Sequence, residues 1–143
     1  MKTLTIFTPA YNRAHTIGRT YESLCRQTCK DFEWLILDDG SQDNTRQLVE
    51  SWIAEDKIPI RYIYQQNQGM HGAHNTAYRN ITTELNTCID SDDYMPDDAV
   101  EKIIMKLPQK EEQITSIYVS HRTDFICNGS LGNFSCRSIL FFH

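Results

Sequence analysis

Residues 86–93 read Asn86-Thr87-Cys88-Ile89-Asp90-Ser91-Asp92-Asp93, an apolar-leaning run followed at once by a serine and three carboxylates. A strand that ends in clustered carboxylates concentrates negative charge, which is costly unless water or a cation neutralises it. Oxygen ligands in a partly open site suit Mg²⁺ or Mn²⁺, which keep waters and take a substrate's phosphates as further ligands. We therefore expect a divalent metal here, and a diphosphate as the group that the site recognises.

Short β-prone runs alternate with amphipathic stretches, which is typical of βαβ units and a mostly parallel sheet. The pattern predicts strands over Thr3–Thr8, Glu33–Leu37, Ile60–Gln65, Asn86–Ile89 and Ile114–Val119. It predicts helices over Thr16–Arg26, Thr45–Glu55, His74–Asn80 and Asp97–Leu107. Asp43-Asn44 suits the N-cap of the second helix, and Pro96 the N1 position of the fourth. The fold class is α/β, an open sheet flanked by helices, whose ligand crevice lies at the carboxyl ends of the strands.

Length and composition narrow the class of protein. A chain of 143 residues has room for one domain of ordinary size. A net charge of −5, without any basic run, argues against nucleic acid as a partner. No stretch of about 18 apolar residues could span a bilayer, so we expect a cytoplasmic protein, at most peripheral at the inner face of the membrane. The five cysteines are scattered, which favours neither a disulfide framework nor a zinc site.

The first strand leads into Thr8-Pro9-Ala10-Tyr11-Asn12-Arg13. Pro9 is expected to take the chain out of regular strand pairing, and Tyr11 offers a flat face on which a base could stack. A strand-to-helix turn with a half-exposed tyrosine explains this stretch equally well.

The second strand ends in Asp38-Asp39-Gly40-Ser41, so a second acidic cluster should face the same crevice. A carboxylate there can accept a hydrogen bond from the imide N–H of uracil or from ribose hydroxyls. The alternative is an Asx turn in which Asp38 and Ser41 cap the next helix, and it applies more to Asp38 than to Asp39.

The third strand is followed by a loop, residues 66–75, that contains two glycines, is rich in hydrogen-bond donors and leads into a helix. Such a loop can place backbone N–H groups and a helix N-terminus near an anion. It matches neither a Walker A loop nor a G-x-G-x-x-G fingerprint. His71 and His74 are interpreted as polar loop residues rather than metal ligands, because the spacing supplies too few ligands.

Taken together and in this order, the motifs resemble family 2 glycosyltransferases, nucleotide-sugar-dependent enzymes with the Rossmann-like fold called GT-A. The resemblance covers about residues 3–107 and rests on Thr8-Pro9-Ala10-Tyr11-Asn12, Asp38-Asp39-Gly40-Ser41 with Asp43-Asn44-Thr45, Asn67-Gln68-Gly69 with Ala73-His74-Asn75, and Asp90-Ser91-Asp92-Asp93 with Pro96. It implies donor contacts at Thr8, Pro9, Tyr11, Asp39, Gly69, Asn75, Asp90 and Ser91. It also implies Asp92 as the metal ligand, with Asp90 as an alternative ligand and Asp93 as a helper in the second shell, the metal being Mn²⁺ or Mg²⁺.

Two departures from the family pattern bear on function. The family commonly has A-R-N where this chain has Ala73-His74-Asn75, so a cationic contact to the donor is either weakened or made by a histidine. Family members also continue well beyond the length of this chain with an acceptor-binding half and a general base, so we expect no base here. Residues 1–119 are then the donor-binding domain and residues 120–143 the incomplete start of the acceptor region. The apolar run Ile139–Phe142 would favour self-association.

The resemblance implies metal-dependent transfer of a sugar, with inversion, from a UDP-sugar to a hydroxyl of a glycan or lipid-linked acceptor. A catalytically silent nucleotide-sugar-binding module is the first alternative. A phosphoacceptor signalling domain is the second, but it needs an acidic pair after the first strand, where this chain has Pro9-Ala10-Tyr11.

Overall fold

The computed structural model describes residues 2–105, 117–119 and 137–141. Its strands are β1 (Leu4–Ala10), β2 (Phe32–Asp38), β3 (Ile60–Tyr64), β4 (Leu85–Cys88), β5 (Ile117–Val119) and β6 (Arg137–Phe141). Its helices are α1 (Ile17–Cys25), α2 (Thr45–Glu55), α3 (Gly69–Asn80) and α4 (Ala99–Met105). The strands form a sheet in the order β3-β2-β1-β4-β6-β5, and every pair of neighbours is parallel. The predicted α/β class and parallel sheet are confirmed.

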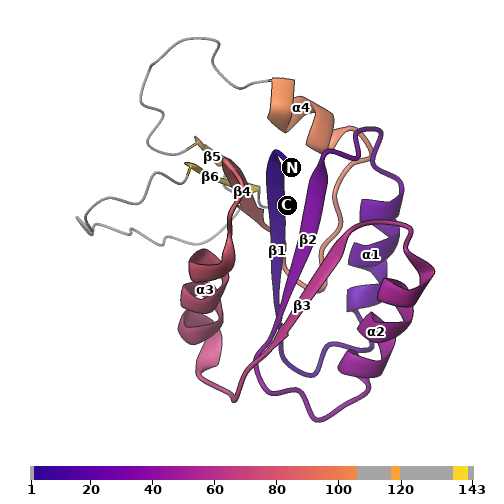
Figure 1. Ribbon diagram of the computed structural model, residues 1–143, viewed down its shortest axis with the longest axis vertical. Coiled ribbons are helices and arrows are strands. Elements are labelled where there is room, and N and C mark those ends of the chain that lie inside the picture. Colours follow the sequence, from indigo (N-terminus) through magenta and orange to yellow (C-terminus); the bar gives the residue numbers. More distant parts are fainter. Residues whose placement is uncertain (1, 106–116, 120–136, 142–143) are drawn as a thin grey trace.

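The chain reverses its direction across the sheet beside β1. It runs outward from β1 to β2 to β3 through α1 and α2, which lie together along one face of the sheet (Figure 1). It then returns through α3, on the other face, to place β4 against the free side of β1. Ligands of open α/β sheets bind at such a reversal, outside the carboxyl ends of the strands. The topology therefore predicts a ligand site at the carboxyl ends of β1, β2 and β4.

Both faces of the central strands are buried, which explains their continuous apolar runs. On the face covered by α1 and α2, the rings of Trp34 in β2, Tyr21 and Trp52 form a stack. The ring centroids of Tyr21 and Trp52 are 4.2 Å apart. The Trp34 indole N–H donates to the Thr8 hydroxyl over 2.9 Å. The smaller core on the α3 face consists of Phe7, Leu35, Leu37, Ala73, Ala77 and Cys88.

Three local predictions at the starts and ends of elements are wrong. First, β1 continues through Pro9 to Ala10 instead of leaving its pairing at the proline. Its pairing with β4 ends at Phe7, so Pro9 lies where one side of the strand has no partner, and the missing N–H interrupts no ladder there. Second, α3 begins at Gly69, five residues before the predicted start at His74. Third, α4 begins at Ala99, so Pro96 precedes the helix and does not occupy its N1 position.

The other elements agree with the sequence-based expectations within one to three residues, and α2 agrees at both ends. The fifth predicted strand is present over Ile117–Val119, and the apolar run 139–142 is in β6 as far as Phe141. Residues 106–116, 120–136 and 142–143 lie outside the described residues, and with them most of the predicted region 120–143. No helix of the described part is long and apolar enough to cross a membrane.

Candidate functional site

The loops that follow β1 and β2 are joined by hydrogen bonds at the carboxyl edge of the sheet. The backbone N–H of Asn12 donates to the Ser41 hydroxyl over 2.8 Å, and the Asn12 side-chain oxygen accepts from the Gln42 N–H over 2.8 Å. Asn12 has φ 54°, a left-handed conformation that asparagine adopts more readily than most residues. At the ends of the two strands themselves, the Asp39 N–H donates to the Ala10 carbonyl over 2.8 Å. The first two loops therefore form one unit.

Asp43 connects the first loop to the start of α2. Its Oδ2 accepts from the Ala14 N–H over 3.1 Å, and its Oδ1 accepts from the Thr45 N–H over 3.0 Å. Asn44 is the N-cap residue of α2 but makes no side-chain capping hydrogen bond, and the carboxylate of Asp43, one residue earlier, accepts from the first helical N–H instead. Partial burial acts to raise the pKa of Asp43, but the hydrogen bonds from Thr45 and Ala14 outweigh it and hold that pKa below its ordinary value.

Replacing Asp43 by alanine should lower the free energy of unfolding by about 1 kcal/mol at neutral pH, the usual worth of a helix cap. Because the folded-state pKa lies below the unfolded-state one, this stability is complete above the unfolded-state pKa and is lost as the pH falls through the folded-state value. Urea unfolding at pH 7 and at about pH 3 should show the two curves converging in acid. Asn44→Ala is the matched control and should change little; an equal loss in both variants would contradict the capping role of Asp43.

The third loop meets the second through Asp39, whose exposed fraction is only 4%. Its Oδ1 accepts from the Gln65 amide over 2.6 Å and from the Gln68 N–H over 2.9 Å, and the Asn67 amide donates to its carbonyl over 3.0 Å. Gly40, with φ +86°, permits this approach, because a Cβ there would lie 2.9 Å from the Asn67 nitrogen. These two bonds occupy Oδ1, which leaves Oδ2 as the oxygen through which Asp39 can accept from a ligand.

Asp38 has the structural role that the sequence left open for it. It is fully buried, its Oδ1 accepts from the Ser41 N–H over 2.7 Å, and its Oδ2 accepts from the Tyr62 hydroxyl. Burial, together with that bond to Asp38, raises the pKa of Tyr62. Asp38 therefore shapes the turn, and Asp39 is the member of the pair placed at the edge of the sheet next to the third loop.

The acidic cluster after β4 comes together as the sequence predicts. Carboxylate oxygens of Asp90, Asp92 and Asp93 all lie within 4.8 Å of one another. The loop is fixed to α1, since the Thr20 hydroxyl donates to the Asp93 carbonyl over 2.8 Å. Loss of surrounding water, followed by repulsion from Asp93 and Asp92, raises the pKa of Asp90, while His74 and Arg13 act to lower it. Such a cluster is stabilised by a cation.

His74 packs inward from α3 toward the sheet. Its Nδ1 lies 2.9 Å from the Met70 carbonyl oxygen, and its Nε2 lies 3.8 Å from the Cys88 sulfur. The ring meets Phe7 edge-on at 5.4 Å between centroids. Burial and the charge of Asp90 raise the pKa of the Cys88 thiol, so the thiol stays protonated and can donate to Nε2. Both ring nitrogens of His74 therefore have partners within the chain.

The remaining predicted site residues differ in their exposure. Tyr11 is 47% exposed, as a stacking surface must be, whereas the Thr8 side chain is buried and bonded to the core indole. Gly69 begins α3 with φ +75°, and Asn75 is exposed on the same helix. Ser91 is buried between the exposed side chains of the acidic loop.

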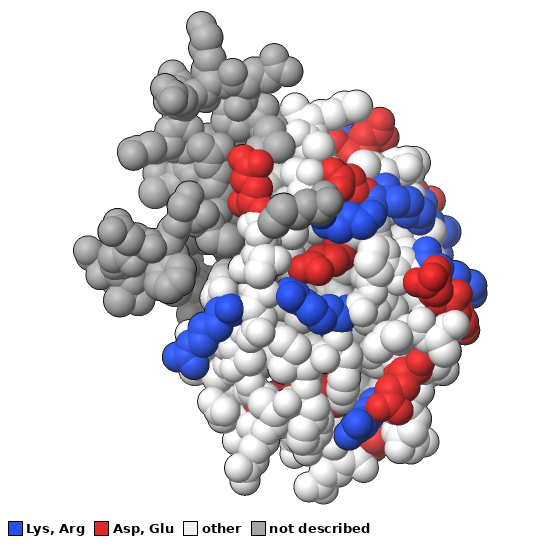
Figure 2. Space-filling model, in the orientation of Figure 1, with Lys and Arg blue, Asp and Glu red and all other residues white. Residues whose placement is uncertain are grey.

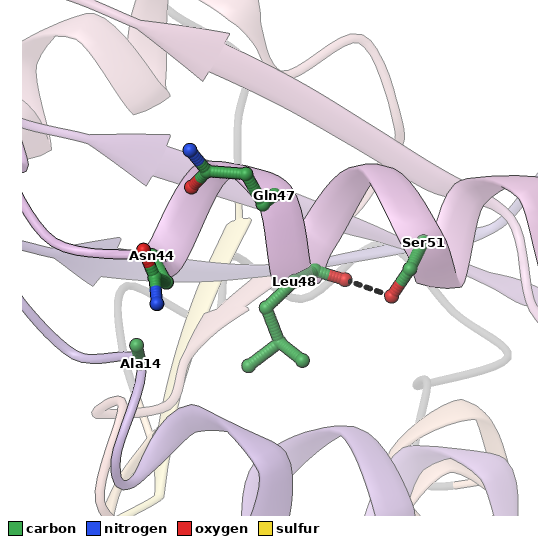
Figure 3. Close-up of a pocket in the computed structure, with 5 residues that line it drawn as sticks. All are labelled: Ala14, Asn44, Gln47, Leu48 and Ser51. Atoms are coloured by element: carbon green, nitrogen blue, oxygen red, sulfur yellow. Dashed lines mark hydrogen bonds between the residues drawn. The ribbon is translucent and has the colours of Figure 1, made fainter.

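A shallow opening of about 570 Å³ lies elsewhere, over the first half of α2. Figure 3 shows its lining residues, Ala14, Asn44, Gln47, Leu48 and Ser51. None of them is a predicted site residue, and their side chains are mostly small, aliphatic or amide. On the face of the molecule in Figure 2, basic and acidic side chains are interspersed, without the basic stripe of a nucleic-acid-binding surface.

Sequence reasoning missed the amide partners of Asp39. Gln65, Asn67 and Gln68 position that carboxylate from the end of β3 and the loop after it. The signal that could have found them is the run Gln65-Gln66-Asn67-Gln68, four consecutive amides directly after a strand and beside an acidic cluster. Amides in that place are suited to hold a carboxylate without neutralising it.

Comparisons with known proteins identify the family of the chain. The family model described as Glycosyl transferase family 2 matches residues 5–129. Chondroitin synthase of Escherichia coli is 35% identical over 119 residues, which are 83% of this chain and 17% of that protein. The crystal structure of S. aureus TarS 1–349 in complex with UDP-GlcNAc matches with a TM-score of 0.67 and 28% identity, over 73% of this chain and 30% of that one.

A third likeness concerns the fold alone. The mannosyltransferase PcManGT from Pyrobaculum calidifontis, solved with GDP-Man and Mn²⁺, has a TM-score of 0.71 at 23% identity, over 83% of this chain and 36% of that one. The chain spans less than half the length of each of these three proteins.

Proposed function

The chain belongs to glycosyl transferase family 2, and on that premise we propose that it binds a nucleotide-diphospho-sugar and takes part in transferring the sugar to an acceptor hydroxyl. The observation that carries the proposal is the convergence, at the carboxyl edge of one parallel sheet, of the loop that holds Asp39 and the acidic loop Asp90–Asp93. Residues 1–119 are proposed as the donor-binding domain.

The nucleoside would lie against the first two loops. Tyr11 is exposed at the end of β1, where its ring can stack on a base, and Asp39 is held on the neighbouring strand by two hydrogen bonds to Oδ1. The free Oδ2 of Asp39 suits the imide N–H of uracil, so we propose a UDP-sugar as the donor. A UDP-GlcNAc complex of a protein similar to this chain supports that choice.

The acidic loop fits a divalent cation. Its three carboxylates offer only hard oxygen ligands and are close enough to share one ion, and loss of surrounding water together with their mutual repulsion raises the pKa of Asp90. Asp92 is proposed as the ligand and Asp90 as a second, with Mn²⁺ or Mg²⁺ as the ion. When bound, such an ion neutralises the charge that builds up on a departing nucleoside diphosphate.

The reaction proposed from family membership is a single displacement at the anomeric carbon, so the configuration inverts. The acceptor hydroxyl, on a glycan or a lipid-linked sugar, forms the new bond as the bond to the diphosphate breaks. Asp39 and Tyr11 would hold the nucleoside in place during this step, and the acidic loop would face the leaving group. No residue of this chain is assigned as the base that takes the hydroxyl proton.

The first test is calorimetric titration of UDP into the full chain with Mn²⁺ and then with excess chelator. We expect binding in Mn²⁺ that weakens markedly in chelator, because the diphosphate then faces uncompensated carboxylates. Absence of binding in both conditions, for UDP and for GDP, would overturn the proposal. Release of UDP from UDP-sugars then distinguishes an enzyme from a silent binding module.

A further inference from the structure

The cluster of three carboxylates needs positive charge opposite it if a diphosphate is to bind there. Two basic residues come from elements that meet the acidic loop. His74 lies against Cys88 at the end of β4, and Arg13 is in the loop that leads into α1, whose Thr20 bonds to Asp93. Both act to lower the pKa of Asp90. One comes from α3 and the other from the loop after β1. They differ in what their side chains already contact, and that difference decides which of them can reach a ligand.

His74 is half-buried, and its ring packs toward the sheet. Its two ring nitrogens lie against the Met70 carbonyl and the Cys88 sulfur, and its ring edge packs on Phe7. Nδ1–H can donate to that carbonyl and Nε2 can accept from that thiol, so both ring nitrogens are already engaged within the chain. In this arrangement neither ring nitrogen is free to donate to a phosphate.

Arg13, in contrast, has an exposed side chain on a backbone that is fixed by hydrogen bonds. Its backbone is fixed, because its N–H donates to the Thr45 hydroxyl over 3.0 Å and its carbonyl accepts from the Thr16 and Ile17 N–H groups, both at 3.0 Å. Its side chain is exposed. The exposed guanidinium therefore extends from a fixed backbone in the loop between β1 and α1, and α1 in turn holds the acidic loop through Thr20.

Four other arginines of residues 2–105 already have partners. Arg19 lies 4.4 Å from the centroid of the Tyr94 ring, and Arg26, Arg46 and Arg61 pair with Asp97, Glu50 and Glu33. Among the arginines of residues 2–105, Arg13 and Arg79 are the two for which the structure shows no ion pair or ring contact. Arg79 lies in the last turn of α3, which starts at the carboxyl edge and runs away from it.

We propose that the guanidinium of Arg13 binds the diphosphate of the donor and that His74 is a packing residue without contact to the donor. The inference rests on the proposed function and adds to it a division of roles between two cationic residues. A guanidinium suits this task, because its parallel N–H groups match two phosphate oxygens and its charge does not titrate. The diphosphate would then lie between Arg13 and the cation held by the acidic loop.

The test compares Arg13→Gln, Arg79→Gln and His74→Gln in the full chain, with UDP followed by calorimetry and uridine by ligand-observed NMR. Arg13→Gln should weaken UDP binding about tenfold or more, the usual worth of a charged hydrogen bond, in Mn²⁺ and in chelator alike. Its affinity for uridine should stay that of the wild type, because uridine has no phosphate. Arg79→Gln removes the same charge at the other end of α3 and should leave UDP binding unchanged, as should His74→Gln.

The outcomes separate this inference from the proposed function. A wild-type chain that binds no nucleotide would overturn both. A wild-type chain that binds UDP, with Arg13→Gln binding it equally well, would overturn the inference alone. So would a His74→Gln variant that keeps its thermal unfolding and its uridine binding but loses UDP. Should His74→Gln fail to fold, the comparison of Arg13→Gln with Arg79→Gln decides the role of Arg13, and the misfolding itself supports His74 as a packing residue.

Discussion

Replacing Asp92 by alanine is expected to abolish the metal-dependent part of nucleotide binding. Asp92 is an exposed carboxylate in a group of three whose oxygens lie within 4.8 Å, so its removal leaves the ion with fewer protein ligands. Loss of an outer partner of a metal ligand typically costs 10- to 100-fold in metal affinity, so loss of a ligand should cost at least about 100-fold. Titration of UDP with increasing Mn²⁺, and then in chelator, measures the effect.

The matched control for this prediction is Asp97→Ala. Asp97 is exposed, lies on the stretch between the acidic loop and α4, and pairs with Arg26 at 3.2 Å. Its removal changes the net charge by the same amount, but an exposed ion pair contributes only about 0–1 kcal/mol to stability. If Asp92→Ala kept the full increase in UDP affinity on addition of Mn²⁺, Asp92 would not be the ligand. Asp90→Ala would then be the next variant to measure.

Replacing Asp39 by alanine should weaken nucleotide binding both with and without metal, and should also destabilise the chain. Asp39 is 4% exposed and accepts from the Gln65 amide and the Gln68 N–H. Leaving those donors without a partner costs about 1–3 kcal/mol of the free energy of unfolding. Urea unfolding measures the loss of stability, and UDP titration in chelator measures the loss of the base contact.

Asp39→Asn separates the two effects. Asparagine keeps an oxygen that can accept from Gln65 and Gln68, so most of the stability should remain. Its amide nitrogen would then take the place of Oδ2 and present a donor to the imide N–H of the base, so UDP binding should still fall. A variant that binds UDP as the wild type does would contradict the contact between Asp39 and the base.

Much of the fold follows from local patterns. The run Trp34-Leu35-Ile36-Leu37 predicts a strand buried on both faces, and β2 is such a strand, with α2 beginning and ending at the predicted residues. Apolar periodicity and turn residues act over a few positions, which is why they can be recognised in the sequence. The position of Asp90, Asp92 and Asp93 just after a strand is a local fact of the same kind, and so is their proximity to one another.

The start of α3 could not be predicted locally. Gly69 and Gly72 are poor helix formers and indicate a loop, yet the helix includes both. Tertiary packing outweighs that preference, because Ala73 and Ala77 are buried in the core that contains Phe7. Gly72 is needed there, since a Cβ would lie 2.3 Å from the Gln68 Cβ. A contact of this kind exists only in the assembled fold.

The sequence by itself therefore determined the class of the fold, the positions of most strands and helices, and the acidic loop at the end of β4, because these depend on neighbouring residues. Only the tertiary structure decided what the individual site residues contact. Asp39 meets Gln65 and Gln68 across 26 and 29 residues of chain, and His74 meets Cys88 across 14. Those contacts require the strand order β3-β2-β1-β4, which brings distant segments to one edge of the sheet. The same order brings a histidine with both ring nitrogens engaged, and an arginine without an ion pair, to the edge of the sheet where the acidic loop lies, a difference that no local pattern contains.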